Sequence, residues 1–310
     1  TQAWKKSVST EEELSGMDSE VRAMLRQAAE REGLDGWLLT LDFPVYHAVM
    51  STATNRALRR EMYEAWTTRA SDQGPGAGSW DNGPTMERIV ALRQEKARLL
   101  GFANYAELSL ATKMVPEPSE VLGFLDDLVS RALPPARREL HELQSFARTD
   151  LGIPDVQPWD VAFVSERLRQ HRFRISDEQI KPYFPAPQVL EGLFNVAESL
   201  YGIRIERVDG VDTWHPDVTY HVVTGPDGAE RGGFYLDLYA RPNKRGGAWM
   251  DACAARMRLE PSHARKPIAF LTCNLSPPVD GHCALFTHDE VITLFHEFGH
   301  CLHHLLTLVD

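Results

Sequence analysis

The 310-residue sequence has few cysteines, no long apolar run and no excess of positive charge. Its four cysteines include no CxxC pair, and a chain this long can build a core without disulfides, so we expect a reducing compartment, the cytoplasm. No apolar run approaches the ~20 residues that span a bilayer, so no membrane partner is expected. The formal net charge of −11 argues against nucleic acid as a partner, because binding phosphates requires clustered lysine and arginine.

The first residues contain neither an initiator methionine nor the apolar core of a signal peptide, so we expect a segment of a longer protein. Hydrophobic residues make up 43% and charged residues 25%, as in globular proteins. Apolar periodicity and end signals predict helices up to about residue 205, within 10–17, 19–33, 84–101, 118–133 and 188–202. The proline pair in "ALPPARREL" predicts a separate charged helix start, and the Gly-rich residues 71–83 predict a linker, because they lack a GK[ST] ending.

Beyond about residue 213 the pattern changes from helix to strand. The stretches 217–224 and 231–240 flank the turn "GPDGAE" and predict a hairpin, and 266–275 predicts a short buried strand. We therefore predict a mainly α fold with a small β-sheet (α+β). The predicted division is a helical region, residues 1–205, followed by residues 206–310 with the sheet and one last helix.

The last helix is predicted to begin near His288, because Thr287 and Glu290 form a capping box. At about 100° per residue, His296 and His300 lie opposite an apolar stripe and one turn apart on the same side. The predicted stripe consists of Val291, Phe295, Phe298, Leu302, Leu305 and Val309.

This spacing suits a zinc ion. Imidazoles at i and i+4 can both reach one ion about 2 Å from each ring nitrogen, so His296 and His300 are the candidate metal ligands. Glu297 is turned to the side of the ion, where a carboxylate can accept a proton from water activated by the metal. The pattern HExxH is typical of zinc metallopeptidases, and Glu297 is the candidate general base.

Simpler interpretations remain open for this helix. The two histidines could be part of a solvated polar face, and His304 could replace His296 as the partner of His300, although Glu297 favours His296. His303 and His304 are interpreted either as groups that contact the metal ligands or as solvated neighbours, and Cys301 as a packed thiol on the side away from the histidines.

The stretches "ALFTHDEVITLFHEFGHCLHHLL", "GGFYLDLYARPNKRGGAWMDAC" and "IAFLTCNLSPPV" resemble the M3 (thimet oligopeptidase) family of zinc metallopeptidases. The resemblance implies a zincin-like active-site helix within a helical, two-lobed, monomeric oligopeptidase whose deep channel admits short peptides. Residues 1–205 would form part of the channel wall. It implies one Zn²⁺ on His296 and His300, Glu297 as the base, and bound peptide beside the strand at Gly247 and Ala248.

The family takes its third zinc ligand from a glutamate on a following helix, and after Glu297 the only acid here is Asp310. We therefore expect this chain to be an internal fragment that is inactive by itself, since a catalytic zinc normally has three protein ligands. The alternatives are a catalytically inactive helical peptide-binding module and a non-peptidase zinc hydrolase. For Gly247 and Ala248 the alternative is a Gly-rich turn leading into a helix.

Overall fold

The computed structural model describes residues 4–260, 263–279 and 281–309. Contacts within the chain group it into two compact units. One is formed by Val49–Arg172 with the first residues of the chain, and the other by Lys6–Ala48 together with Phe173–Asp310. This grouping differs from the predicted division near residue 205, which follows the change from helix to strand and stays a prediction. None of the described helices is both long and apolar enough to cross a membrane.

The unit around Val49–Arg172 is helical. In chain order it contains α3 (Arg56–Thr67), α4 (Gly83–Leu99), α5 (Tyr105–Leu110), α6 (Pro118–Asp150), the 3-10 turn η2 (Pro158–Asp160) and α7 (Val161–Phe173), and α2 (Phe43–Thr52) crosses the boundary between the units.

The second unit combines a sheet with helices. Its elements are β1 (Lys5–Val8), η1 (Glu11–Leu14), α1 (Ser19–Arg31), β2 (Trp37–Thr40), α8 (Asp177–Ile180), η3 (Lys181–Tyr183), α9 (Ala186–Tyr201), β3 (Arg204–Val208), β4 (Thr219–Thr224), β5 (Glu230–Tyr239), β6 (Trp249–Ala254), β7 (Met257–Glu260), β8 (His263–Arg265), β9 (Ile268–Leu275) and α10 (His288–Leu305).

A buried carboxylate joins two elements of the helical unit. Asp160, in η2, is fully buried and accepts hydrogen bonds from Arg59 Nη2 at 2.8 Å and Arg56 Nη2 at 2.6 Å, both on α3. Burial alone would raise the pKa of Asp160, but hydrogen bonds from Arg56 and Arg59 lower it below its ordinary value. Because Arg59 is also buried, the charges of Arg59 and Asp160 stabilise each other, and removing either would leave the other buried without a counter-charge.

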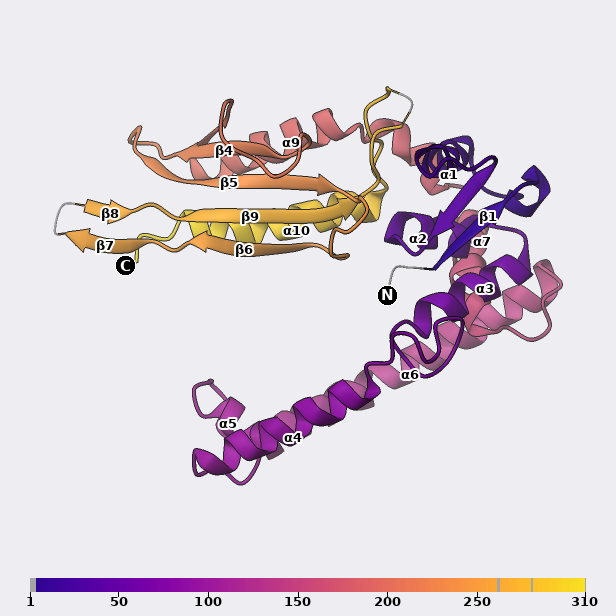
Figure 1. The fold of residues 1–310 in the computed structure, drawn as a ribbon, viewed down its shortest axis with the longest axis horizontal. Helices are drawn as coiled ribbons and strands as arrows, with labels where there is room; N and C mark the ends of the chain where they lie inside the picture. Colours follow the sequence, from indigo (N-terminus) through magenta and orange to yellow (C-terminus); the bar gives the residue numbers. More distant parts are fainter. Residues whose placement is uncertain (1–3, 261–262, 280, 310) are drawn as a thin grey trace. The chain divides into compact units, whose positions relative to one another are not determined.

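The sheet of the second unit has the strand order β3-β4-β5-β9-β6 (Figure 1). β4 and β5 form the predicted hairpin, β9 is the predicted buried strand, and β5 and β9 run parallel. β6 pairs antiparallel with β9 and is the outermost strand on that side. The pairs β1-β2 and β7-β8 form separate two-stranded sheets.

One face of this sheet carries the core of the unit. The side chains of Phe234, Leu236 and Leu238 alternate along β5 into that core, as the period of two in a strand requires. α9 and α10 pack on this same face (Figure 1), where Phe194 of α9 lies 5.8 Å from Phe298 of α10 between ring centroids. α9 ends at Gly202 with φ of 65°, a conformation that favours glycine.

The structure corrects several predictions for the first 205 residues. Two short strands, β1 and β2, occur there, and the stretch 10–17 contains only the single turn η1. Pro134 and Pro135 lie inside α6 and do not begin a new helix. The carbonyls that lose their partners to these prolines belong to an exposed stretch, where water can bind them.

We predict that Asp160→Asn lowers the free energy of unfolding by about 3 kcal/mol, because it leaves the buried Arg59 charge uncompensated. Urea unfolding followed by tryptophan fluorescence, to which the neighbouring Trp159 contributes, measures this change. The matched control is Asp127→Asn, which removes an exposed ion pair with Arg131 and should cost less than about 1 kcal/mol. Equal losses in the two variants would contradict the role assigned to Asp160.

A second prediction concerns His221 on β4, which is buried and stacked on Phe234, and whose Nδ1 has no partner among the described residues. Burial lowers its pKa from 6.5 to about 4. The unfolded chain therefore binds the proton first, and stability present above pH 6.5 is lost as the pH falls toward 4.

The expected loss from His221 between pH 7 and pH 4 is about 3 kcal/mol. Carboxylates also titrate in this range, so the measurement is the difference between the pH dependence of unfolding in wild type and in His221→Phe. The variant should have the flatter profile. Parallel profiles would show that His221 is protonated without cost in the folded state.

Candidate metal centre and sheet edge

α10 begins at His288, where the sequence predicts it. Thr287 N donates to Glu290 Oε2 at 2.8 Å and Glu290 N donates to Thr287 Oγ1 at 3.2 Å, which completes the capping box. The other oxygen of Glu290 accepts from the backbone N–H of Ser276 at 2.7 Å. Glu290 therefore also ties the start of α10 to the segment that leaves β9.

The buried face of α10 differs in part from the predicted stripe. Phe298, Leu302 and Leu305 are buried as expected, but Phe295 is 39% exposed and Val309, beyond the helix end, is 79% exposed. Leu294 and Cys301 take their places in the core. The buried Cys301 confirms the reading of this residue as a packed thiol.

His296 and His300 lie on the exposed side of α10. Their Nε2 atoms are 3.2 Å apart, with the rings nearly perpendicular at 85°. Two nitrogens about 2.0–2.1 Å from one tetrahedral zinc ion lie about 3.3–3.4 Å apart. The two imidazoles therefore fit a pair of ligands on a single ion.

Glu297 lies between these histidines in sequence and is half-buried. Among the described residues, no hydrogen bond or ion pair engages its carboxylate. Its negative charge reaches the sheet: burial raises the pKa of the Cys273 thiol on β9 to about 12, and Glu297 adds to that rise.

The remaining histidines of α10 have other surroundings. His304 Nε2 lies 3.0 Å from the carbonyl oxygen of Ala254 at the end of β6, whereas His303 is exposed. Within residues 4–260, 263–279 and 281–309 no group of three His, Cys, Asp or Glu side chains is arranged to hold a metal. The described residues therefore provide a pair of candidate ligands without a third.

Gly247 and Ala248 lie in the turn that enters β6, so the alternative of a turn into a helix is wrong. β6 pairs with β9 on one side, and no described strand pairs with its other side. The φ of Gly247 is 97°, which few other residues adopt, and its carbonyl accepts a hydrogen bond from Asn274 Nδ2 at 2.6 Å. α10 contacts both β6 and β9.

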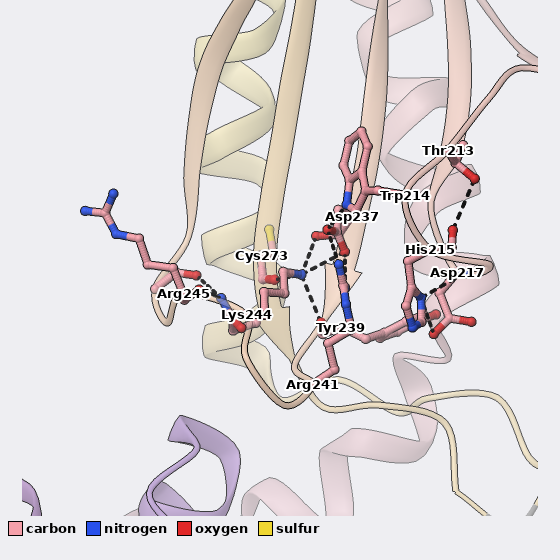
Figure 2. A network of polar contacts seen from close by, with 12 residues as sticks. Thr213, Trp214, His215, Asp217, Asp237, Tyr239, Arg241, Lys244, Arg245 and Cys273 are labelled. Carbon is pink, nitrogen blue, oxygen red and sulfur yellow. Dashed lines mark hydrogen bonds and ion pairs between the residues drawn. The ribbon is translucent and has the colours of Figure 1, made fainter. Parts of the chain in front are cut away.

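A polar cluster lies at the end of β5, before this turn (Figure 2). Asp237 is almost fully buried and accepts two hydrogen bonds from Arg241 at 2.6 and 2.8 Å, one from Lys244 Nζ at 2.8 Å and one from Trp214 Nε1 at 3.0 Å. Although burial alone would raise it, these hydrogen bonds lower the pKa of Asp237 to about 2. Burial lowers the pKa of Lys244, and its hydrogen bond with Asp237 opposes that change.

Comparison with known proteins places the chain in a family. The family model described as "Peptidase family M3" matches residues 49–310, which are most of the chain. The chain belongs to peptidase family M3. This confirms the resemblance found in the three sequence stretches.

Several relatives align with the whole of this M3 chain or nearly so. Oligopeptidase A of Escherichia coli (strain K12) is 54% identical over 310 residues, which are 100% of this chain and 46% of that protein. Probable cytosolic oligopeptidase A of Arabidopsis thaliana is 40% identical, with 100% of this chain and 45% of that protein covered. Dipeptidyl carboxypeptidase of Escherichia coli (strain K12) is 36% identical, with 94% of this chain and 42% of that protein covered. The chain thus spans less than half of each of these M3 relatives.

The cluster around Asp237 was not expected from the sequence of this M3 chain. The signal is present in "DLYARPNK", where an arginine follows the aspartate by four residues and a lysine by seven. In an isolated strand and loop these charges indicate only a solvated surface. Asp237 and Lys244 become buried because β5 pairs with β9, and the spacing of the charged residues along the sequence does not reveal this pairing.

The surroundings of the four cysteines predict their reactivity. Burial raises the pKa values of Cys273 and Cys301 to about 12, whereas Cys253 and Cys283 are exposed. At pH 8, iodoacetamide should modify the two exposed thiols of the native protein and reach the two buried ones only after unfolding. Mass spectrometry of the tryptic peptides measures this pattern, and rapid native labelling of Cys301 would contradict the packing of α10.

Proposed function

We propose that the M3 protein represented by this chain is a zinc-dependent metalloendopeptidase that hydrolyses short oligopeptides. The observation that carries the proposal is the pair of imidazole nitrogens of His296 and His300, 3.2 Å apart. Beside them in the sequence lies the carboxylate of Glu297, which no described residue engages. Membership of a peptidase family supports it from a second direction.

In this proposal His296 and His300 would hold one zinc ion through their Nε2 atoms. The ion supplies Lewis-acid chemistry, polarising the peptide carbonyl and increasing the acidity of water. Glu297 accepts a proton from the attacking water and passes it to the nitrogen of the leaving amine. Because a catalytic zinc normally has three protein ligands, a third ligand must join the pair in the active enzyme.

The sheet edge provides a place for the substrate. β6 lies at the edge of the described sheet, and an extended peptide can add there as a further strand through backbone hydrogen bonds. Gly247 and Ala248 precede this edge, and their small size lets a peptide backbone approach closely. These two residues are proposed to lie beside the bound peptide.

The relatives support short peptides as the substrate class, because three bacterial relatives carry the name oligopeptidase A. One plant relative is named as probably cytosolic. We extend both features to this protein and propose a cytoplasmic, monomeric enzyme that acts on neither nucleic acid nor membranes. We also propose that the 310-residue chain is inactive by itself.

The main alternative is a catalytically inactive helical module that binds peptides. Such a module needs neither a base nor a metal. The intact Glu297, which no described partner engages, argues against it, since a module that only binds peptide needs no general base.

Glu297→Gln tests the assignment of the base in the full-length gene product. The substitution keeps the shape of the side chain but removes its basicity, so kcat for a quenched oligopeptide should fall by about 100- to 10,000-fold. Zinc content, measured by atomic emission, should stay at the wild-type value because the two histidines are unchanged.

Two histidine variants serve as controls. His296→Ala should lose zinc together with activity, and His303→Ala, an exposed histidine on the same helix, should keep both. Retained turnover in Glu297→Gln would eliminate the proposed base. Stoichiometric zinc with no cleavage by the wild-type protein would support the peptide-binding module.

A further inference from the structure

The register of the parallel strands β5 and β9 shifts by one residue near their carboxyl ends. Asp237 pairs with Thr272, but the next pair is Tyr239 with Leu275, so β9 contains one more residue than β5 across this interval. A bulge of this kind interrupts the hydrogen-bond ladder and leaves backbone groups without their regular partners. Buried carbonyl groups at this point need donors from elsewhere.

Lys244 provides those donors. Its Nζ lies 3.1 Å from the carbonyl oxygen of Asp237, 2.9 Å from that of Tyr239 and 2.5 Å from that of Cys273, and 2.8 Å from Asp237 Oδ1. The three N–H groups of the ammonium are thus shared among four acceptors on both strands. Figure 2 shows this nitrogen between the ends of β5 and β9.

The position of Lys244 is itself fixed. Only 6% of its side chain is exposed, and the Asp237 carboxylate that balances its charge is held in turn by Arg241 and by Trp214 Nε1. A flexible surface lysine would not keep one geometry, whereas a buried ammonium that contacts four oxygens does.

A second contact holds the rest of the turn. Asn274, on β9, donates from Nδ2 to the carbonyl of Arg245 at 2.8 Å and to that of Gly247 at 2.6 Å. Lys244 and Asn274 therefore hold residues 244–247 against the end of the sheet, and Trp249 begins β6 two residues later.

We propose that Lys244 is a positioning residue. By closing the bulge between β5 and β9 it holds the turn 244–248 and thereby sets the start of edge strand β6, where peptide is bound. The second half of this statement rests on the proposed function. Lys244 itself does not touch the substrate; it reduces the motion of the backbone groups that do, so that less freedom is lost when peptide binds.

The test compares Lys244→Met with Lys266→Met in the full-length gene product. Methionine keeps the unbranched side chain but has no donor, and Lys266 forms an exposed ion pair with Glu230 just before β9. Asn274→Ala removes the hydrogen bonds of Asn274 to the carbonyls of Arg245 and Gly247. It tests whether the turn is held in the same way if Lys244→Met folds poorly.

The first readout is native trypsin cleavage of the bond after the exposed Arg245, normalised to a synthetic peptide with the same turn sequence. We expect cleavage to be at least 10-fold faster in Lys244→Met and in Asn274→Ala, and unchanged in Lys266→Met. The second readout is peptide hydrolysis, for which KM should rise about 10-fold while kcat stays within threefold and zinc content is unchanged.

The outcomes separate this inference from the proposed function. Unchanged trypsin cleavage, or faster cleavage with unchanged KM, would overturn the positioning role. Loss of zinc and of kcat with unchanged KM would mean that Lys244 supports the metal helix and not the edge, which also overturns it. If the wild-type protein cleaves no peptide the proposed function fails, and the trypsin rates alone decide whether Lys244 holds the turn.

Discussion

The packing of α10 on the five-stranded sheet is the contact on which the candidate site depends. Leu294, Phe298 and Leu305 are buried against the sheet, and this fixes the rotation of the helix. With the rotation fixed, His296 and His300 face away from the core. The apolar contacts thus decide where the imidazoles are displayed, and the capping box decides where the helix begins.

Each of the two units contains a buried aspartate that is paired with two cationic side chains. Asp160 and Asp237 are each almost fully buried, and each is held by two cations from a neighbouring segment. An unpaired carboxylate at either position would be costly, so these clusters specify how the segments meet. In the helical unit the segments are α3 and η2; in the sheet unit they are β5 and the turn that follows it.

Local signals in the sequence predict the elements whose ends they mark. The capping box at Thr287, the hairpin turn at residues 225–230 and the glycine after α9 lead to correct boundaries. Pro134 and Pro135 misled the prediction because the helix-breaking effect of proline is local and the exposed α6 tolerates it. Steps of three and four residues fit two overlapping stripes on α10, and only packing distinguishes Leu294 from Phe295.

For the candidate site, spacing alone predicts that His296 and His300 approach one another, and the metal role remains a proposal. The cluster around Asp237 could not be predicted in this way, because its acceptors come from two strands that meet only in the folded sheet.

The order of the strands in the sheet also differs from their order in the chain. β6 precedes β9 in the chain, yet β9 is its only strand partner in the described sheet. β6 therefore takes its place at the sheet edge only through residues 268–275, the same residues that pair with β5. The edge at which we place the peptide thus depends on a strand that follows it in the chain.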